Sequence, residues 1–328
     1  MLAAGRRRAL RRHGWLVRRL ALGAVTLFLV SVVVFAATQA LPSDPAQSIL
    51  GRGAQPEQLE ALRQQLGLDR PLVTQYLDWL GGALTLDMGN SLSASNTSVA
   101  DLIGPRLENS ALLLGITGLL LVTVSVVVGV LCALYRDSPA DHATQGAALV
   151  ANALPEFVVG TLLVIMFSTV VLQWLPAVSL ASDQSPLSDP KTMVLPVATL
   201  LIVTLPYLMR LVRGSMLDVL RAHYVEMARL KGVEERRILW RHVLPNALVP
   251  AIQGSAATLA YLAGGIVVVE TLFNYPGLGS QLTTSMGVRD LPVIQACVLL
   301  LAALYVVLNL IADILTVVVT PRLRTRMR

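Results

Sequence analysis

The sequence is poor in charge and in aromatic side chains. Only 14% of its 328 residues are Asp, Glu, Lys or Arg and 5% are Phe, Trp or Tyr, while 55% are hydrophobic. So low a charged fraction excludes an ordinary soluble domain, in which about a quarter of the residues are charged. The chain is long enough for several membrane spans, each of which needs about 20 apolar residues. We therefore expect an integral membrane protein.

Motifs that carry chemistry are also missing. No Gly-x4-Gly-Lys-Ser/Thr loop occurs, so any ATP must be handled by another chain. The four His residues lack metal-ligand spacing, and neither Gly-x-Ser-x-Gly nor His-Glu-x-x-His is present. Cys132 and Cys297, the two cysteines, fall at opposite ends of the spans predicted below, which argues against a disulfide. The sequence predicts no metal site, no cofactor bound by this chain and no enzyme.

Six long apolar runs predict an all-α membrane protein with six transmembrane helices. The runs cover residues 18–40, 110–134, 145–174, 195–213, 248–270 and 293–318. The predicted polar parts are a basic N-terminal tail, an outer segment, a charged segment and a basic C-terminal tail, which cover residues 1–17, 41–109, 217–247 and 319–328. In the outer segment, flanking Pro, Asp and Gly residues predict short helices over 56–66 and 70–80, the second ending at Gly81-Gly82.

The distribution of basic residues predicts the orientation. Residues 1–19 have seven Arg, residues 210–242 have eight Lys or Arg and the C-terminal tail has four, so that with Arg136 one side holds 20 of the 26 basic residues. The positive-inside rule then places both termini in the cytoplasm. An Arg-rich tail before an apolar run is also typical of a cleavable signal peptide. The run 18–40 is longer than a usual signal core and opens a series of spans, which favours an uncleaved first span.

The densest charged stretch is EMARLKGVEERRILWRHVLP, residues 226–245. Its pattern predicts a short helix that ends near Gly232 and a second helix that starts at Glu234. Pro245 and Pro250 are expected to separate this second helix from the next span. A solvated loop that only fixes the topology would explain the charges. It would not explain the apolar side chains among them, which favour a docking surface: Met227, Leu230, Val233, Ile238, Leu239 and Trp240.

Six positions of this stretch follow the spacing Glu-x-Ala-x3-Gly-x9-His-x-Leu-Pro, and Met227 stands at its first x. The six are Glu226, Ala228, Gly232, His242, Leu244 and Pro245. The pattern resembles the EAA loop of ABC importer permeases, Glu-Ala-Ala-x3-Gly-x9-Ile-x-Leu-Pro. Met227 and His242 depart from it, and His at this place is familiar from the peptide-importing branch. The resemblance implies that the charged segment is a coupling helix seated in a groove of a cytoplasmic ATPase.

The resemblance covers nearly the whole chain and points to the B-type permease of dipeptide, oligopeptide and nickel importers. The matching stretches are LGLDRPL (66–72), DMG (87–89), ETLFNYPGLG (270–279), RDLPVIQ (289–295) and the pair Asn309 and Asp313. Leu86 and Glu156 depart from the family, which usually has Gly and a small Ser there, and these departures leave the substrate open. By resemblance, a structural or gating role is implied for Glu270, Asn274, Pro276 and Gly277.

The resemblance implies a type I ABC importer permease in the bacterial cytoplasmic membrane, with di- or oligopeptides as the expected substrates. Its implied partners are a homologous second permease, two cytoplasmic ATPase subunits that bind ATP and Mg²⁺, an extracytoplasmic substrate-binding protein and membrane lipid, with no nucleic acid. Nickel, an opine–metal complex or glutathione are alternative substrates. A rival class, an ion-gradient-driven transporter, would show inverted repeats and paired midplane charges, which the sequence lacks.

Two acidic positions inside the apolar runs are further candidates. Glu156 follows Pro155 about ten residues into the third run, which would place it near mid-bilayer, where an acid usually faces a cavity or a partner. Pro155 would also free the carbonyl of Ala151. Glu156 is therefore a candidate for the translocation pathway, unless the span starts later and leaves it at the interface. For Asn309 and Asp313 a structural hydrogen bond or ion pair is favoured over a transport role.

Overall fold

The computed structural model of the chain describes residues 2–40, 45–50, 53–65, 69–94, 97–179 and 186–319. In these ranges the fold is helical, and the one extended pairing is an isolated bridge between Asn90 and Ser98. Five helices of the described ranges are long and apolar enough to cross a membrane, and a bent pair of helices makes a sixth crossing possible by length and composition. The predicted all-α membrane fold is confirmed.

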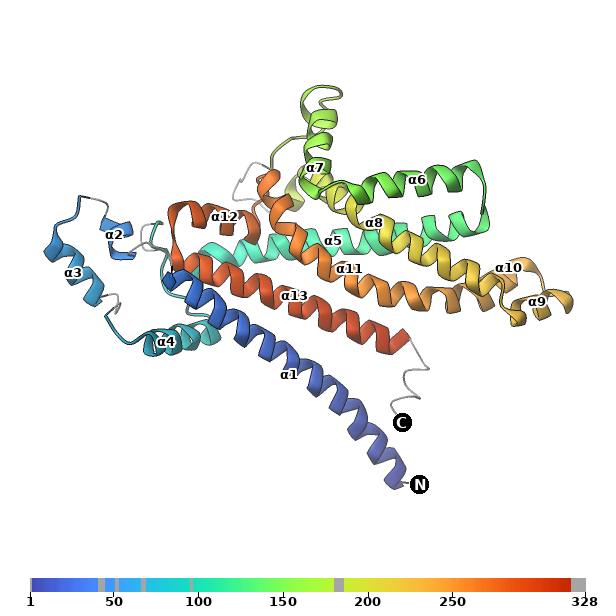
Figure 1. Ribbon diagram of the computed structural model, residues 1–328, viewed down its shortest axis with the longest axis horizontal. Coiled ribbons are helices and arrows are strands. Elements are labelled where there is room, and N and C mark those ends of the chain that lie inside the picture. The colour runs from blue at the N-terminus through green and yellow to red at the C-terminus, as the bar shows by residue number, and fades with distance from the viewer. Residues whose placement is uncertain are drawn as a thin grey trace.

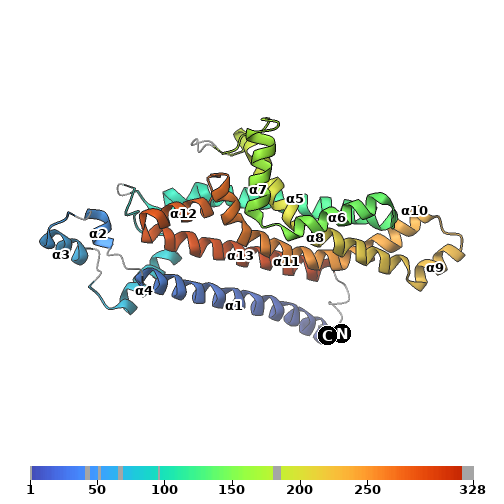
Figure 2. The same ribbon diagram turned by 45° about the horizontal axis from the view of Figure 1, so that its top comes forward.

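The long helices share one direction. They are α1 (Leu2–Ala40), α5 (Val99–Leu134), α8 (Lys191–Leu220), α11 (Leu244–Leu272) and α13 (Leu291–Val319). In Figure 1, α5, α8, α11 and α13 run along the long axis of the molecule, and α1 lies beside α13 on the outside of the group. Figure 2, like Figure 1, shows the first residues of α1 and the last of α13 both on the side toward α9 and α10.

Each long helix extends beyond the apolar run that predicted it. The run 110–134 belongs to a helix that begins at Val99, where the Ser98 hydroxyl accepts the N–H of Ala100 at 3.2 Å. The predicted tail 1–17 is helical from Leu2. Polar residues continue a helix as readily as apolar ones, so the apolar run marks only the part that suits hydrocarbon. The C-terminal tail, apart from Val319, lies outside the described residues.

The third predicted span, residues 145–174, is not one helix. It consists of α6 (Pro139–Ala153) and α7 (Glu156–Val164), which continues as a π-helical turn to Thr169, and the two parts meet at 108°. The break follows from Pro155, because a proline excludes the helical conformation at the preceding residue, and Leu154 is extended at φ −93° and ψ 133°. Ala151 keeps a partner, since its carbonyl accepts the N–H of Leu154 at 3.4 Å. The expected freeing of that carbonyl is wrong.

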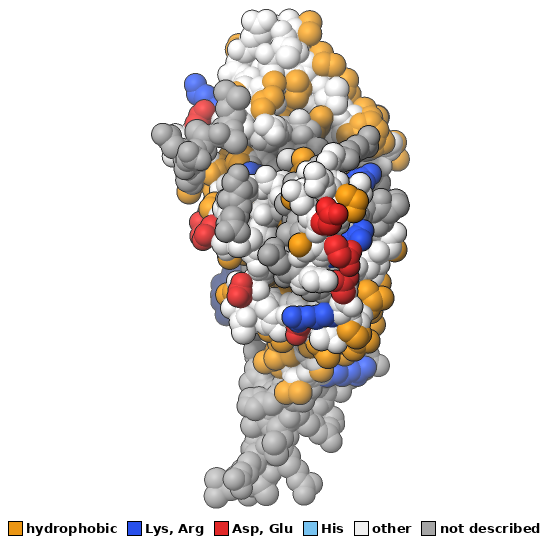
Figure 3. Space-filling model, turned by 90° about the vertical axis from the view of Figure 1, so that its left-hand side faces the viewer, with side chains coloured by type: hydrophobic (Ala, Val, Ile, Leu, Met, Phe, Trp, Pro, Cys, Tyr) orange, Lys and Arg blue, Asp and Glu red, His pale blue; other side chains and the backbone are white. Residues whose placement is uncertain are grey.

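Short helices gather at the end of the group opposite to α9 and α10 (Figure 1). They are α2 (Pro45–Leu50), α3 (Pro56–Gln65), α4 (Leu72–Thr85) and α12 (Leu278–Val288). Viewed from this end, Figure 3 shows acidic and basic side chains among the apolar ones, as suits a surface outside the hydrocarbon. α12 was not expected from the sequence, and α4 continues through Gly81-Gly82, so the predicted stop at the two glycines is wrong.

The aromatic side chains of α4 explain how so short a helix is held. Tyr76 and Trp79 form a cluster with Phe35 of α1, with ring centroids 5.4–6.1 Å apart, and the Tyr76 hydroxyl lies 2.8 Å from Ser31 Oγ. Isolated helices of this length are marginal in water, so packing on α1 supplies the stability that α4 lacks alone.

The core lies where α5, α8 and α11 meet. Its fully buried side chains come from all three helices and include Leu121, Leu208, Val212, Leu262 and Ile266. A Cβ on Gly129 would come within 2.7 Å of the Met209 carbonyl, so α5 and α8 approach more closely than any larger residue allows. This rigid centre carries both sites described next: the charged segment at one end and a cavity beside the α6–α7 break.

Candidate functional site

The charged segment, residues 217–247, folds as a helix, a glycine turn and a second short helix. α9 (His223–Leu230) ends at Gly232, whose φ is 71°. The N–H of Val233 reaches back to the carbonyl of Ala228 at 3.1 Å and that of Gly232 to Arg229 at 2.9 Å, which closes a Schellman turn. α10 (Glu235–Ile238) follows, and Figure 1 shows both helices projecting beyond the ends of α5 and α6.

The structure divides the apolar side chains of this segment into two groups. Ile238 is buried, and Val233 and Leu239 are half-buried against the ends of the long helices. Met227, Leu230 and Trp240 are exposed by 58%, 75% and 62%. The second group forms an apolar surface with no covering partner among the described residues. Such a surface, rimmed by charge, is typical of a protein-docking site.

Glu226 lies in the first turn of α9, three residues before Arg229. Arg229 does not contact Glu226 but forms a two-point ion pair with Glu235, with Nε–Oε1 at 2.6 Å. The hydrogen-bonded Glu235 carboxylate raises the pKa of Arg229. The Glu226 side chain is 70% exposed, and His223 stands 3.9 Å away on the same helix. Glu226 is therefore available to a basic group on another protein.

Pro245 and Pro250 do not separate the second helix from the next span, as the sequence had predicted. α10 passes into a π-helical turn, Leu239–Val243, and then directly into α11, in which Pro245 occupies the first turn. The π-helical turn just before Pro245, in which the N–H of Leu244 bonds the carbonyl of Leu239, keeps the chain helical, and Pro250 lies inside α11. His242 is half-buried, and its carbonyl accepts the Asn246 side-chain amide at 2.7 Å. Leu244, also half-buried, begins α11.

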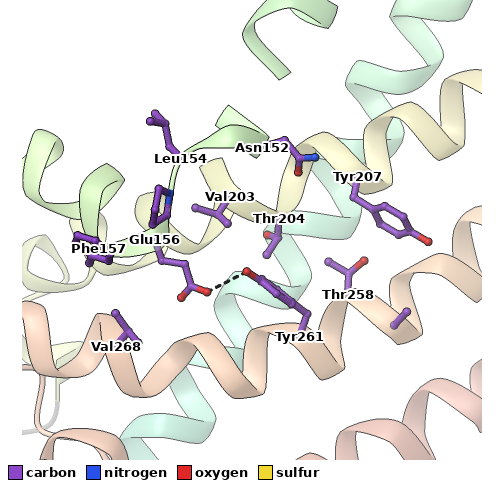
Figure 4. Close-up of a pocket in the computed structure, with 12 residues that line it drawn as sticks. Asn152, Leu154, Glu156, Phe157, Val203, Thr204, Tyr207, Thr258, Tyr261 and Val268 are labelled. Atoms are coloured by element: carbon purple, nitrogen blue, oxygen red, sulfur yellow. Dashed lines mark hydrogen bonds between the residues drawn. The ribbon is translucent and has the colours of Figure 1, made fainter. Parts of the chain in front are cut away.

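A cavity of about 560 Å³ lies beside the break between α6 and α7. It is lined by residues of α6, α7, α8 and α11, and Figure 4 shows Glu156 reaching from the start of α7 toward Tyr261 of α11. Tyr207 and Thr204 come from α8 and Thr258 from α11. α6 rises about 22 Å over its 15 residues, so Glu156 stands well away from the end where α6 begins. In Figure 1 the α6–α7 junction falls near the middle of the long helices.

The Glu156 carboxylate is only partly satisfied. Its Oε1 accepts a hydrogen bond from the Tyr261 hydroxyl at 3.1 Å, while its buried Oε2 has no hydrogen-bond partner in the described residues. A Cβ on Gly265 would overlap this carboxylate, so glycine makes the room in which it sits. Pro155, which the sequence paired with Glu156, ends the preceding extended turn and places Glu156 in the first turn of α7. There the helix dipole favours a negative charge.

Glu270 stands in a different environment, at the end of α11. It is fully buried, and its oxygens accept the Ser110 hydroxyl and the N–H of Gly279, each at 2.6 Å. A Cβ on Gly277 would overlap the carboxylate. The Ser110 hydroxyl in turn accepts the N–H of Leu278 at 2.8 Å. Glu270 therefore fastens the start of α12 to α5, which favours a structural role.

The loop between α11 and α12 is tied to α5 at further points. The Asn109 amide donates to the carbonyl of Pro276 at 2.9 Å, and the buried Tyr275 hydroxyl donates to the carbonyl of Asn109 at 3.0 Å. Burial raises the pKa of Tyr275, so this hydroxyl stays protonated as a donor. Asn274 turns the chain with φ 46°, a left-handed conformation that Asn tolerates better than most residues.

The pair Asn309 and Asp313 is not a unit in the structure. Asp313 forms an ion pair with Arg19 of α1, with Nη1 and Oδ2 3.0 Å apart, and the Asn309 amide donates to the Tyr305 carbonyl at 2.9 Å. Both contacts join or stabilise helices. They agree with the structural interpretation of these residues and lend no support to a transport role.

The sequence interpretation missed a buried ion pair between α6 and α8. Arg213 Nε donates to Asp141 Oδ1 at 2.9 Å and Nη2 to Oδ2 at 2.6 Å, and Asp141 is 2% exposed. α8 leads directly into α9, so this pair connects the charged segment to the helix that ends at the cavity. An Arg in an apolar helix signals that a partner is needed, but the sequence alone does not identify it.

Asp290, between α12 and α13, was also missed as an anchor. Its carboxylate accepts the hydroxyls of Ser91 and Ser93 and the backbone N–H groups of Leu92 and Ser93. Burial raises the pKa of Asp290, but these hydrogen bonds outweigh burial and hold the pKa below its ordinary value. The loop that follows α4 is thereby fixed on the start of α13.

Two family models match the chain. The model described as the binding-protein-dependent transport system inner membrane component matches residues 125–325. The model for the N-terminal part of such membrane components matches residues 13–127. The two matches together take in the charged segment, the cavity and the Glu270 contacts.

Curated relatives are similar over nearly their whole length. A relative from Brucella abortus (strain 2308) is named as a peptide transport system permease. It is 36% identical over 310 residues, which are 94% of this chain and 98% of the relative. The glutathione transport system permease protein GsiC of Escherichia coli O6:H1 is 37% identical over 312 residues, with the same two coverages. A relative from Brucella ovis, named as a peptide permease, is 33% identical over 313 residues.

Proposed function

Since the chain belongs to the family of binding-protein-dependent transport system inner membrane components, we propose that it forms half of the translocation pathway of an ATP-driven importer for di- or oligopeptides. The peptide substrate is supported by the names of its Brucella relatives. Glutathione, the substrate named for GsiC, is the second candidate, and it is itself a small peptide with a free amino group.

The charged segment carries this proposal, because it has the form that coupling to an ATPase requires. It is a rigid pair of short helices at one end of the group, closed by a turn that needs a glycine. It presents Met227, Leu230 and Trp240 to the outside together with the exposed Glu226. Apolar anchors within a charged rim are what a protein groove recognises. The EAA-like spacing of the segment agrees with this role.

The partners follow from the family. A cytoplasmic ATPase and an extracytoplasmic substrate-binding protein are implied, and we extend the proposal to two ATPase subunits and a homologous second permease. ATP and Mg²⁺ would be bound by the ATPase chains. Both termini and the charged segment would face the cytoplasm of a bacterium, with the bent pair α6 and α7 as the sixth crossing.

The test of coupling uses the full complex in proteoliposomes, with binding protein inside or outside as the orientation requires. Glu226→Lys reverses the charge offered to the ATPase, and Gly232→Pro fixes φ near −65° where the turn needs 71°. Both variants should insert normally, lose ATP-driven uptake and lose substrate-stimulated ATP hydrolysis.

Glu57→Lys is the matched control, since Glu57 is also an acid in the first turn of a short helix, at the opposite end of the molecule. It should retain uptake and ATP hydrolysis. Normal coupling in Glu226→Lys and Gly232→Pro would contradict the proposal, and so would an equal loss in Glu57→Lys.

A further inference from the structure

The cavity beside the α6–α7 break has an unusual chemical composition for the interior of a membrane protein. It holds one carboxylate, Glu156, together with hydroxyl groups and aromatic rings from Tyr207 and Tyr261. Among the described residues no Lys, Arg or His forms an ion pair with Glu156. The only hydrogen bond to the carboxylate comes from the neutral Tyr261 hydroxyl.

A carboxylate at such a place is costly, and the fold compensates it only in part. Insertion of an acid at the centre of a membrane helix costs about 2.5–3.5 kcal/mol, so such groups normally have a partner. Glu270, on the same bundle, has a hydrogen-bond donor at each oxygen, Ser110 at Oε1 and Gly279 at Oε2. In the described residues Glu156 has one donor, Tyr261 at Oε1, and none at Oε2, which is buried against Gly265. The charge of Glu156 is therefore less compensated than that of Glu270, and a cation that enters the cavity would be attracted to it.

We infer that this cavity is a transient binding site for the ammonium group of a substrate in transit, with Glu156 as its anion. The inference rests on the proposed function, because it requires a substrate that passes along α7, α8 and α11. A primary ammonium donates three hydrogen bonds, and the carboxylate and the Tyr261 hydroxyl oxygen offer acceptors on one side. The rings of Tyr207 and Tyr261 add a surface on which a cation is attracted.

A monovalent ammonium fits this donor set better than a divalent metal ion does. In the described part of the chain no group of three or more His, Cys, Asp or Glu side chains comes together, at this cavity or elsewhere. One carboxylate leaves half of a divalent charge unbalanced, whereas it balances a single ammonium. Gly265 makes room for the carboxylate, which a Cβ at that position would overlap.

The first experiment measures the attraction for a cation in the purified chain, without partner subunits. Ala257 lines the cavity and is exposed, while the native Cys132 and Cys297 are buried. In an Ala257→Cys variant, the reaction rates with cationic 2-aminoethyl methanethiosulfonate and with neutral methyl methanethiosulfonate are compared. Their ratio cancels any change in the reactivity of the thiol itself. Addition of Glu156→Gln should lower the cationic-to-neutral ratio by about tenfold.

Two neighbouring glycines provide a matched pair for the same measurement. Gly265→Ala should raise the ratio, because its methyl group overlaps the Glu156 carboxylate and turns it toward the cavity, whereas Gly264→Ala should not change the ratio, because nothing lies within 4 Å of a Cβ there. A ratio that stays the same in Glu156→Gln, or that changes equally in both glycine variants, would overturn the inference.

The second experiment tests transport by the full complex in proteoliposomes, with trialanine and N-acetyl-trialanine as probes. Glu156→Gln should slow uptake of trialanine by about tenfold and leave uptake of the acetylated peptide within about twofold. A role for Glu156 in ammonium binding would be overturned if uptake of both peptides slowed equally, or if uptake of neither slowed. Loss of ATP-driven uptake in the unmodified complex would instead contradict the proposed function. The thiol experiment remains decisive if the acetylated peptide is not transported.

Discussion

Glu156 and Glu270 are two acids of one helical bundle in opposite situations. Glu270 is fully buried and holds the Ser110 hydroxyl and the Gly279 N–H at 2.6 Å each. Glu156 is half-buried at the edge of a cavity, with one 3.1 Å hydrogen bond from Tyr261 and an unpartnered Oε2. Each carboxylate also lies against a glycine, Gly277 for Glu270 and Gly265 for Glu156.

The difference separates a structural acid from an available one. The hydrogen bonds of Glu270 join α5, α11 and α12, so its oxygens hold together elements that are distant in the sequence. The one hydrogen bond that Glu156 accepts in the described residues joins α7 to α11. Glu156 lines the cavity, and its buried Oε2 lies against Gly265 without a donor among those residues. Burial of an acid inside a membrane protein is therefore not by itself a sign of transport. The number of donors that already surround it is the better criterion.

The largest expected difference is in stability. Glu270→Ala leaves the Ser110 hydroxyl and the Gly279 N–H buried without acceptors and should destabilise the protein by about 3 kcal/mol or more. Glu156→Ala removes one hydrogen bond beside a cavity and should cost about 1 kcal/mol. Thermal unfolding of the two variants in detergent, followed by size-exclusion chromatography, measures the difference. Equal losses would show that Glu156 is as structural as Glu270.

The two glycines provide a smaller and sharper comparison. A methyl group on Gly277 meets a carboxylate that cannot move without breaking its hydrogen bonds, so Gly277→Ala should destabilise by about 2 kcal/mol. On Gly265 the methyl group meets a carboxylate that has a cavity to turn into, and the cost should be below about 1 kcal/mol. The same unfolding measurement applies. A larger loss for Gly265→Ala than for Gly277→Ala would contradict the proposed freedom of Glu156.

Asp290 extends the comparison to an acid outside the spans. Its folded-state pKa is depressed, so its contribution to stability is present above the ordinary value of about 4 and is lost as the pH falls through the folded pKa. Asp290→Asn should destabilise by about 1–2 kcal/mol at pH 7. The gap between variant and wild type should narrow as the pH is lowered below about 4. A gap that does not change with pH would show that the carboxylate charge is not what fixes the loop.

Local features of the sequence were sufficient for much of the fold. The apolar runs located the long helices, and Gly232 was recognised as a turn because glycine adopts a positive φ freely. Predictions failed where a proline acts differently in different surroundings. Pro155 breaks its helix by 108°, while Pro245 lies in the first turn of α11 and breaks nothing. Four other prolines lie inside helices that continue through them, so a proline does not by itself decide a break: Pro105, Pro196, Pro206 and Pro250. Neighbouring helices can hold the chain helical despite the missing N–H.

The candidate site was predictable only in part. The charged segment was identified from its pattern, but the exposure of Met227 and Leu230, as opposed to the burial of Ile238, follows from how the segment sits against α8 and α11. Glu156 was singled out because an acid inside an apolar run is rare. The role of Glu156 in binding the ammonium group of a substrate stays a prediction, and so does the coupling role of Glu226.

The sequence by itself determined the class of the protein, the places of its long helices and the turn at Gly232, because apolar length and backbone preference act within a few neighbouring residues. Tertiary structure alone decided which acids are satisfied. Ser110 reaches Glu270 across 160 residues and Tyr261 reaches Glu156 across 105, and such pairs form only when whole helices pack. Since the cost of a buried charge depends on the donors around it, the packing of the helices makes Glu270 an anchor and leaves Glu156 open.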